Sequence, residues 1–226
     1  MGPFDSSASA GPPDKFELSA AGGWRLAAVG GVVGPAAFIG AWVVGSATKA
    51  GYSPVDEAIS QLAAIGASTR PAMTGGFVVF GIGVAFYATS LRRALGGLAW
   101  VTAAATGLAT IGVAALPLER SAAVDTWHGA AAGLAYLTLA ATPLLARRPL
   151  RERSHRRLTA LSGLVAVVTA TSLALSLTGL PTGLFQRIGL TSGHLWIIGS
   201  ATAILRARPA RSPTESPAPT AAAASR

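Results

Sequence analysis

The chain has 226 residues, of which 51% are hydrophobic and only 12% are charged. This composition leaves no room for a soluble domain beside several membrane helices, and the absence of cysteine excludes disulfides, thiolate metal ligands and a cysteine nucleophile. The formal net charge of +9 could suggest nucleic acid as a partner. We attribute it instead to loops at one membrane face, where basic residues fix topology and meet anionic lipid head groups, and we expect no nucleic acid.

The two ends of the chain differ from its centre. Residues 1–23 mix Gly, Pro, Ser and acidic residues, and we predict a disordered cytoplasmic tail there. No basic segment of the signal-peptide type precedes the first apolar stretch, which is therefore predicted to be a retained membrane helix. Residues 207–226 are rich in Pro and Ala and are predicted to be a second disordered cytoplasmic tail. Residues 24–206 form the predicted membrane domain.

Between the tails lie apolar stretches that reach or approach the ~20 residues a helix needs to cross the hydrocarbon of a bilayer. None has a Lys or Arg well inside it. The predicted spans are residues 26–48, 72–91, 95–118, 127–146, 158–180 and 188–205. The predicted fold class is all-α, a polytopic membrane bundle with six transmembrane helices.

The segments that join these spans alternate between rich and poor in Lys and Arg. Fourteen of the 18 basic residues fall in the tails and in the second and fourth connections. The other four are Lys49, Arg70, Arg120 and Arg187, in the first, third and fifth connections. Because basic residues are retained in the cytoplasm, both termini are predicted to be cytoplasmic, in a multi-pass protein of the bacterial inner (plasma) membrane.

Small residues predict where the helices approach one another, since membrane helices associate through residues that let their backbones come close. Gly30 and Gly34 lie in the first predicted span, and four glycines lie between residues 75 and 83 in the second. Gly129 and Gly133 lie in the fourth. We expect all three groups to lie at helix contacts of a compact bundle.

The first connection, on the outer side, predicts a short amphipathic helix. Ser53 is followed by Pro54 and then Asp56, an arrangement typical of a capping box, and apolar residues recur at helical spacing as far as Gly66. Asp56 and Ser60 are four residues apart and would share a face of this helix. Two interpretations stay open: these side chains cap and pack the helix, or they belong to a site.

Asp125, His128 and His194 form a second group near the outer face. Asp125 and His128, three residues apart at the start of the fourth span, could bind a metal such as zinc or relay a proton. Alternatively, Asp125 could cap the helix by accepting the backbone N–H of His128. His194, within about two turns of the outer end of the last span, is an imidazole among apolar residues and a candidate third ligand.

The fifth connection is apolar for a loop and ends in Gln186 and Arg187, which are candidates for binding substrate. Arg187 could pair with Asp56 or Asp125, or hold a lipid phosphate. An ordinary loop arginine without a specific partner is the other interpretation.

These segments together resemble a known family. The pattern Ser-Pro-x-Asp-x-x-x-Ser-x-Leu occurs at residues 53–62, Asp-x-x-His at 125–128 and Gly-Leu-x-Gln-Arg at 183–187. In this order, and in these places relative to six spans, they resemble the bacterial membrane family called domain of unknown function 998, over residues 24–206. The resemblance implies a small six-helix membrane protein and leaves its activity open.

Three functions are consistent with the sequence. The first is a structural, accessory or lipid-interacting membrane protein whose outer polar residues hold the spans together. The second is a metal-dependent enzyme that hydrolyses or remodels lipid at the outer leaflet, with zinc as the candidate metal. Its catalytic residues would be Asp56, Ser60, Asp125 and His128, and its metal ligands Asp125, His128 and His194. The third is a transporter of a small solute or lipid, although the apolar midplane and the lack of a clear repeat argue against it.

Overall fold

The computed structural model describes residues 23–207, so that the predicted tails lie, apart from Gly23 and Ala207, outside the described residues. Within this range every regular element is helical. The 3₁₀ helix η1 (Ala27–Val29) leads into α2 (Gly30–Thr48), and a second 3₁₀ helix, η2 (Ile59–Ala63), precedes α3 (Arg70–Leu95). The chain then forms α4 (Ala99–Ala115), α5 (Ala122–Glu152), α6 (Arg156–Ser176) and α7 (Thr182–Arg206).

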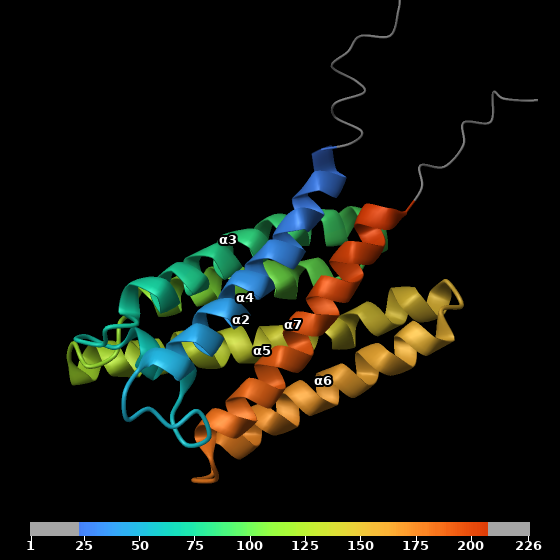
Figure 1. Ribbon diagram of the computed structural model, residues 1–226. Helices are drawn as coiled ribbons and strands as arrows, with labels where there is room; N and C mark the ends of the chain where they lie inside the picture. Colours follow the sequence, from blue (N-terminus) through green and yellow to red (C-terminus); the bar gives the residue numbers. More distant parts are fainter. Residues whose placement is uncertain (1–22, 208–226) are drawn as a thin grey trace, which may run out of the picture.

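The six α-helices form a closed bundle. Each helix packs against the next one in the chain, and α7 returns to pack against α2 (Figure 1). The first and last described residues lie at the same end, where the side chain of Arg25 donates a hydrogen bond to the carbonyl oxygen of Ala207 (Figure 1). Consecutive helices therefore run up and down the bundle and return the chain to the end at which it began.

The helices have the length and surface of membrane spans. Five are long and apolar enough to cross a bilayer: Gly23–Thr48, which contains α2, and α3, α5, α6 and α7. Helix α4 is also apolar but has 17 residues, about 26 Å at 1.5 Å per residue, the short end of the spanning range. Large hydrophobic side chains are exposed on every α-helix, among them Val43, Phe86, Leu108, Leu137, Leu164 and Leu195. The chain is a multi-pass helical membrane bundle.

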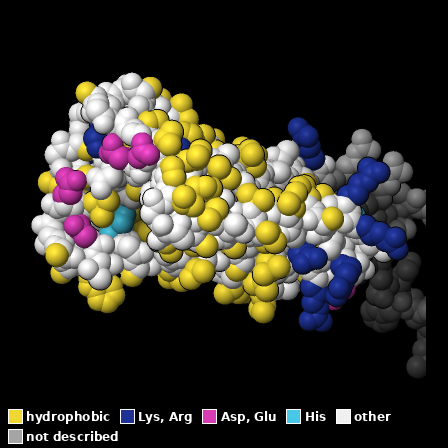
Figure 2. All heavy atoms as spheres, turned by 90° about the horizontal axis from the view of Figure 1, so that it is seen from below, with side chains coloured by type: hydrophobic (Ala, Val, Ile, Leu, Met, Phe, Trp, Pro, Cys, Tyr) yellow, Lys and Arg dark blue, Asp and Glu magenta, His cyan; other side chains and the backbone are white. Residues whose placement is uncertain are grey.

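Charge is concentrated at the two ends of the bundle. Figure 2 shows Asp and Glu side chains at one end, most Lys and Arg side chains at the other, and a surface without charged side chains, largely hydrophobic, between them. We call the first the acidic end; it holds the α2–α3, α4–α5 and α6–α7 connections. The second is the basic end, with the two ends of the described chain and the α3–α4 and α5–α6 connections. Arg153, in the α5–α6 connection, donates a hydrogen bond to the carbonyl oxygen of Ala94 at 2.7 Å.

The predicted third span, residues 95–118, begins too early and ends too late. Helix α3 continues to Leu95, and Gly96 and Gly97 follow with φ values of +73° and +66°. Two successive residues in the left-handed region cannot continue an α-helix, so α4 begins only at Ala99. It ends at Ala115, because Leu116 precedes Pro117 and is held outside the helical region.

The fourth and sixth spans begin more than one helical turn earlier than predicted. Helix α5 starts at Ala122, where Ser121 is the capping residue and its side chain accepts the N–H of Val124 at 3.3 Å. The cap predicted at Asp125 is therefore wrong. Helix α7 starts at Thr182, directly after Pro181, so that Gln186 and Arg187 lie inside a helix and not in a connection. The predicted spans start after Asp125 in α5 and after Gln186 and Arg187 in α7, because these polar residues interrupt the apolar pattern near the start of each helix.

The amphipathic helix predicted in the α2–α3 connection is also wrong. The side chain of Ser53 accepts the N–H of Asp56 at 3.2 Å, as a capping residue should, but the turn stops at Ala58, where ψ is 146°. Helical structure returns only in η2. In a continuous helix, the backbone groups of this segment would bond to one another, but two of them bond to α7 instead. The carbonyl of Val55 accepts the N–H of Leu184, and the N–H of Ile59 donates to the side chain of Gln186.

Glycines allow α2, α3 and α4 to pack with their backbones in contact. A Cβ atom on Gly83 would lie 2.6 Å from the carbonyl oxygen of Gly30, and one on Gly107 would lie 2.5 Å from that of Gly81. The prediction is confirmed for Gly30 in the first span and for Gly81 and Gly83 in the second. It is wrong for Gly75, Gly129 and Gly133, where no atom lies within 4 Å of the added Cβ.

We expect Gly83→Ala to destabilise the bundle by about 1–3 kcal/mol, because the methyl group must push α2 and α3 apart. Thermal unfolding of the protein in detergent micelles measures this. Gly75→Ala in the same helix is the matched control, since its Cβ meets nothing within 4 Å. Alanine favours the helix, so the control should unfold at the same temperature as wild type or higher. Equal losses in both variants would contradict the close contact.

Candidate functional site

Arg187 lies at the centre of the acidic end, in the first part of α7, and only 9% of it is exposed. Its Nη1 donates to the carbonyl oxygens of Glu57 at 3.2 Å and Gly183 at 3.0 Å. Its Nη2 donates to the hydroxyls of Ser46 at 3.3 Å and Tyr52 at 2.6 Å. One buried guanidinium therefore joins the end of α2, the α2–α3 connection and the start of α7.

Aromatic rings complete the surroundings of this cation. The guanidinium carbon lies 5.1 Å from the ring centroid of Trp42 and 5.6 Å from that of Tyr52, both in the range of cation–π attraction. Burial raises the pKa of the Tyr52 hydroxyl, although the hydrogen bond and the positive charge of Arg187 act to lower it. Tyr52 is therefore protonated at neutral pH, and its hydroxyl faces the carbonyl oxygens of Glu57 and Ala58 at 3.2 and 3.0 Å.

The α2–α3 connection lies directly on the start of α7. A Cβ atom on Gly183 would be 2.3 Å from the carbonyl oxygen of Glu57 and 2.6 Å from that of Pro54, so only glycine permits this approach. One helical turn later, the side-chain oxygen of Gln186 accepts the N–H of Ile59 at 2.6 Å. We call this arrangement the loop latch: Tyr52, Gly183, Gln186 and Arg187, with the backbone of residues 54–59.

The carboxylates predicted as partners of Arg187 lie elsewhere. Asp56 is exposed and accepts the hydroxyl of Ser53 at 2.6 Å, within its own turn. Asp125 accepts the N–H of Glu119 at 2.9 Å and so fastens the α4–α5 connection. Within residues 23–207 no carboxylate lies within 4.0 Å of Arg187, so neither predicted ion pair forms. The charge of Arg187 is balanced by carbonyl and hydroxyl dipoles.

His128 joins α5 to the end of α4. It is 4% exposed, and its Nδ1 lies 2.6 Å from the carbonyl oxygen of Leu116. A carbonyl oxygen can only accept, so Nδ1 carries a proton and donates it to Leu116. Among the described residues, the buried Nε2 has no hydrogen-bond partner. The geometry gives His128 a structural bond through Nδ1.

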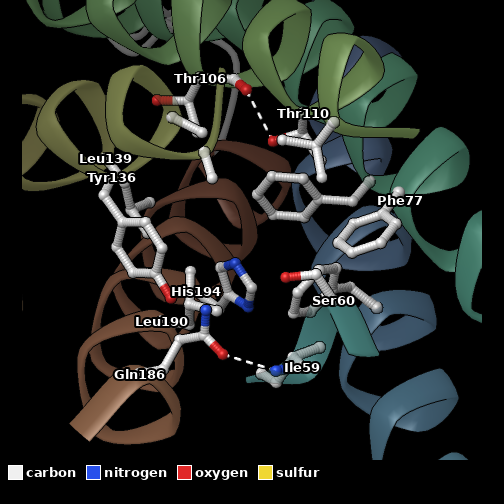
Figure 3. A pocket seen from close by; sticks show the side chains of 15 residues that line it. Ile59, Ser60, Phe77, Thr106, Thr110, Tyr136, Leu139, Gln186, Leu190 and His194 are labelled. Carbon is white, nitrogen blue, oxygen red and sulfur yellow. Dashed lines mark hydrogen bonds between the residues drawn. The ribbon is translucent and has the colours of Figure 1, made fainter. Parts of the chain in front are cut away.

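His194 lies deeper in the bundle, with 1% of it exposed. Its ring centroid is 5.0 Å from that of Phe38 and 4.6 Å from that of Phe80. It borders a cavity of about 40 Å³ whose wall also includes Ser60 and Gln186. Figure 3 shows the side chains of Tyr136, Gln186 and His194 pointing toward the same space, with Ile59 bonded to Gln186 beside it. The α2–α3 connection therefore covers one side of this cavity.

The size of the cavity limits its chemistry. About 40 Å³ accommodates at most a few water molecules, and it cannot receive a lipid head group. Of the predicted site residues, the structure brings Ser60, Gln186 and His194 to this cavity and places Arg187 beside it. Asp56 stays on the exposed side of the connection, and Asp125 and His128 lie at the junction of α4 and α5. No group of three His, Asp or Glu residues with metal-binding spacing occurs in the described chain.

Sequence reasoning missed several residues of the latch and the cavity. They are Trp42, Ser46, Tyr52, Thr106, Thr110 and Tyr136. Tyr136 gave a detectable signal, since a phenol inside an apolar span needs a polar neighbour when buried. Thr106 and Thr110 gave no such signal, because a threonine in a helix can satisfy its hydroxyl with its own backbone. Each donates to the carbonyl oxygen four residues earlier in α4, at 2.9 and 2.8 Å.

Comparison with known proteins gives one match. The family model described as "Protein of unknown function (DUF998)" matches residues 32–203, which include the loop latch and both buried histidines. Neither the search of curated proteins nor that of solved structures gives a match.

We expect Arg187→Gln to lower the free energy of unfolding by about 2–3 kcal/mol, since several buried oxygens lose a charged donor. Arg187→Lys should recover only part of this, because an ammonium cannot donate in two directions from a planar fork. Thermal unfolding and protease cleavage of residues 53–66 measure the effect. Arg120→Gln removes an exposed arginine at the same end and should change neither. Unaltered stability in Arg187→Gln would contradict the latch.

Proposed function

Since the chain belongs to the DUF998 family of proteins of unknown function, whose description carries no activity over to it, we propose a function from its own geometry. The protein is a structural or accessory membrane protein without catalytic activity, and the loop latch closes its bundle at the acidic end. One observation carries this proposal. The candidate substrate-binding pair, Gln186 and Arg187, is turned inward and holds the chain's own backbone.

At the acidic end, where the predicted site residues lie, the alternatives lack the space that they require. A lipid hydrolase needs an open cleft in which a head group meets its catalytic groups, and the cavity beneath η2 has a volume of about 40 Å³. The carboxylates of Asp56 and Asp125 hold local turns of two different connections. A transporter would need a wider polar route to the middle of the bundle. These features support a bundle whose polar groups stabilise its own fold.

The proposal includes six spans with both termini in the cytoplasm. Helix α4 counts as a span because it carries no charged residue, and its 17 residues lie within the spanning range. The clustering of Arg at the basic end supports this end as the cytoplasmic one (Figure 2). The acidic end, with the loop latch, then faces outward.

Cysteine labelling tests this orientation, because the chain has no native cysteine. We expect Ser68→Cys and Thr178→Cys, both exposed at the acidic end, to react with a membrane-impermeant maleimide in intact cells. Leu98→Cys, 64% exposed at the basic end, should react only after permeabilisation. Labelling of Leu98→Cys from outside, with protection of the other two, would invert the orientation. Opposite results for Ser68→Cys and Thr178→Cys would contradict the number of spans.

Elemental analysis of the detergent-purified full-length protein tests the absence of metal catalysis. We expect no stoichiometric metal in wild type, His128→Ala or His194→Ala. Both variants should be less stable by about 2–4 kcal/mol, because each removes a packed ring. His155→Ala, at an exposed position of the basic end, should match wild type. About one zinc per chain in wild type, lost in both buried-histidine variants and retained in His155→Ala, would overturn the proposal in favour of a hydrolase.

A further inference from the structure

A second and much larger cavity, of about 1040 Å³, lies at the basic end, opposite the loop latch. Its walls come from the start of the described chain, the end of α3, the α5–α6 connection and one side of α6 and α7. The volume is at the upper limit of small-molecule sites, which range from about 300 to 1,000 Å³. The apolar wall includes Leu91, Leu158, Leu161, Leu195, Trp196 and Ile204.

The cavity is continuous with the surface that faces lipid. Leu158, Leu161 and Leu195 line it while being 50%, 51% and 59% exposed. Leu195 precedes the end of α7 at Arg206 by eleven residues, which places it about 16 Å along the helix from the basic end. The cavity therefore extends from the level of the head groups into the hydrocarbon. A small soluble anion would occupy only its mouth, whereas an acyl chain matches both its depth and its apolar wall.

Three arginines, Arg25, Arg93 and Arg153, also line this cavity. Within residues 23–207 the one ion pair is between Arg148 and Glu152, so none of the three has a carboxylate partner there. Arg25 and Arg153 each donate to a backbone carbonyl, which leaves most of their five N–H donors available. Guanidinium groups match the oxygens of a phosphate in geometry as well as in charge.

We propose that this cavity binds an anionic phospholipid of the leaflet at the basic end. Its phosphate lies among Arg25, Arg93 and Arg153, and an acyl chain lies against α6 and α7. Basic pockets between membrane helices on the cytoplasmic side are suited to such head groups. The site is independent of the loop latch, so that the failure of either proposal leaves the other intact.

Native mass spectrometry of the full-length protein, titrated with phosphatidylglycerol or phosphatidylcholine of the same acyl chains, tests the charge requirement. We expect phosphatidylglycerol to bind about tenfold more tightly or better. The triple variant Arg25→Gln, Arg93→Gln, Arg153→Gln should lose this preference. Arg151→Gln, Arg156→Gln, Arg157→Gln removes the same charge from the same end, outside the cavity, and should keep it. Equal affinity for the two lipids in wild type, or equal losses in both triple variants, would overturn the proposal.

Gly199→Phe tests the cavity itself. Gly199 lines the wall, and its added Cβ meets nothing within 4 Å, so the ring can fill the cavity without a backbone clash. We expect binding of phosphatidylglycerol to weaken about tenfold or more. Gly133→Phe, equally unobstructed on α5 and outside the cavity, should bind as wild type does. Undiminished binding in Gly199→Phe, or a photocross-linker at position 199 that captures residues 208–226 in place of phosphatidylglycerol, would overturn the proposal.

Discussion

The burial of Arg187 is the constraint on which the acidic end depends. A guanidinium that leaves water loses hydration worth several kcal/mol, and it stays charged, so the fold must supply oxygens around it. The carbonyls of Glu57 and Gly183 and the hydroxyls of Ser46 and Tyr52 do so. This requirement fixes the path of the α2–α3 connection. The same path places η2 over the cavity at His194, so one buried charge organises α2, α7 and the connection between α2 and α3.

The two ends of the bundle treat positive charge in opposite ways. At the acidic end a single arginine is enclosed, and the chain itself satisfies its Nη donors. At the basic end Arg25, Arg93 and Arg153 line a wide cavity and face no carboxylate within the described chain. The enclosed charge contributes to folding, because its partners are present whenever the chain is folded. Arg25 and Arg153 each use one donor on a backbone carbonyl and keep the others open, and these open donors are the ones that our proposal assigns to the phosphate of a lipid.

The approximate places of the apolar helices, the helical fold class and the family could be predicted because each depends on local features of the sequence. The length of an apolar stretch indicates a helix that can cross the hydrocarbon of a bilayer, and short sequence motifs indicate the family. Contacts between distant segments could not be predicted. A carbonyl oxygen has no sequence signature, so the specific partners predicted for Arg187 were charged groups: Asp56, Asp125 or a lipid phosphate. Likewise Gly30 and Gly133 look alike in sequence, and only the bundle shows that Gly30 meets another backbone while Gly133 does not.

The two longer motifs that carry the family resemblance meet in space and form one structural unit. In the motif at residues 183–187, Gly183 permits the close approach, Gln186 accepts a backbone N–H and Arg187 donates to backbone oxygens. The motif at residues 53–62 supplies the other side: a turn fixed by Ser53 and Asp56, followed by the backbone that α7 binds. Each motif position that reasoning about catalysis would have assigned to substrate thus has a folding role. A motif rich in Ser, Asp, Gln and Arg can therefore encode a loop that closes a membrane bundle.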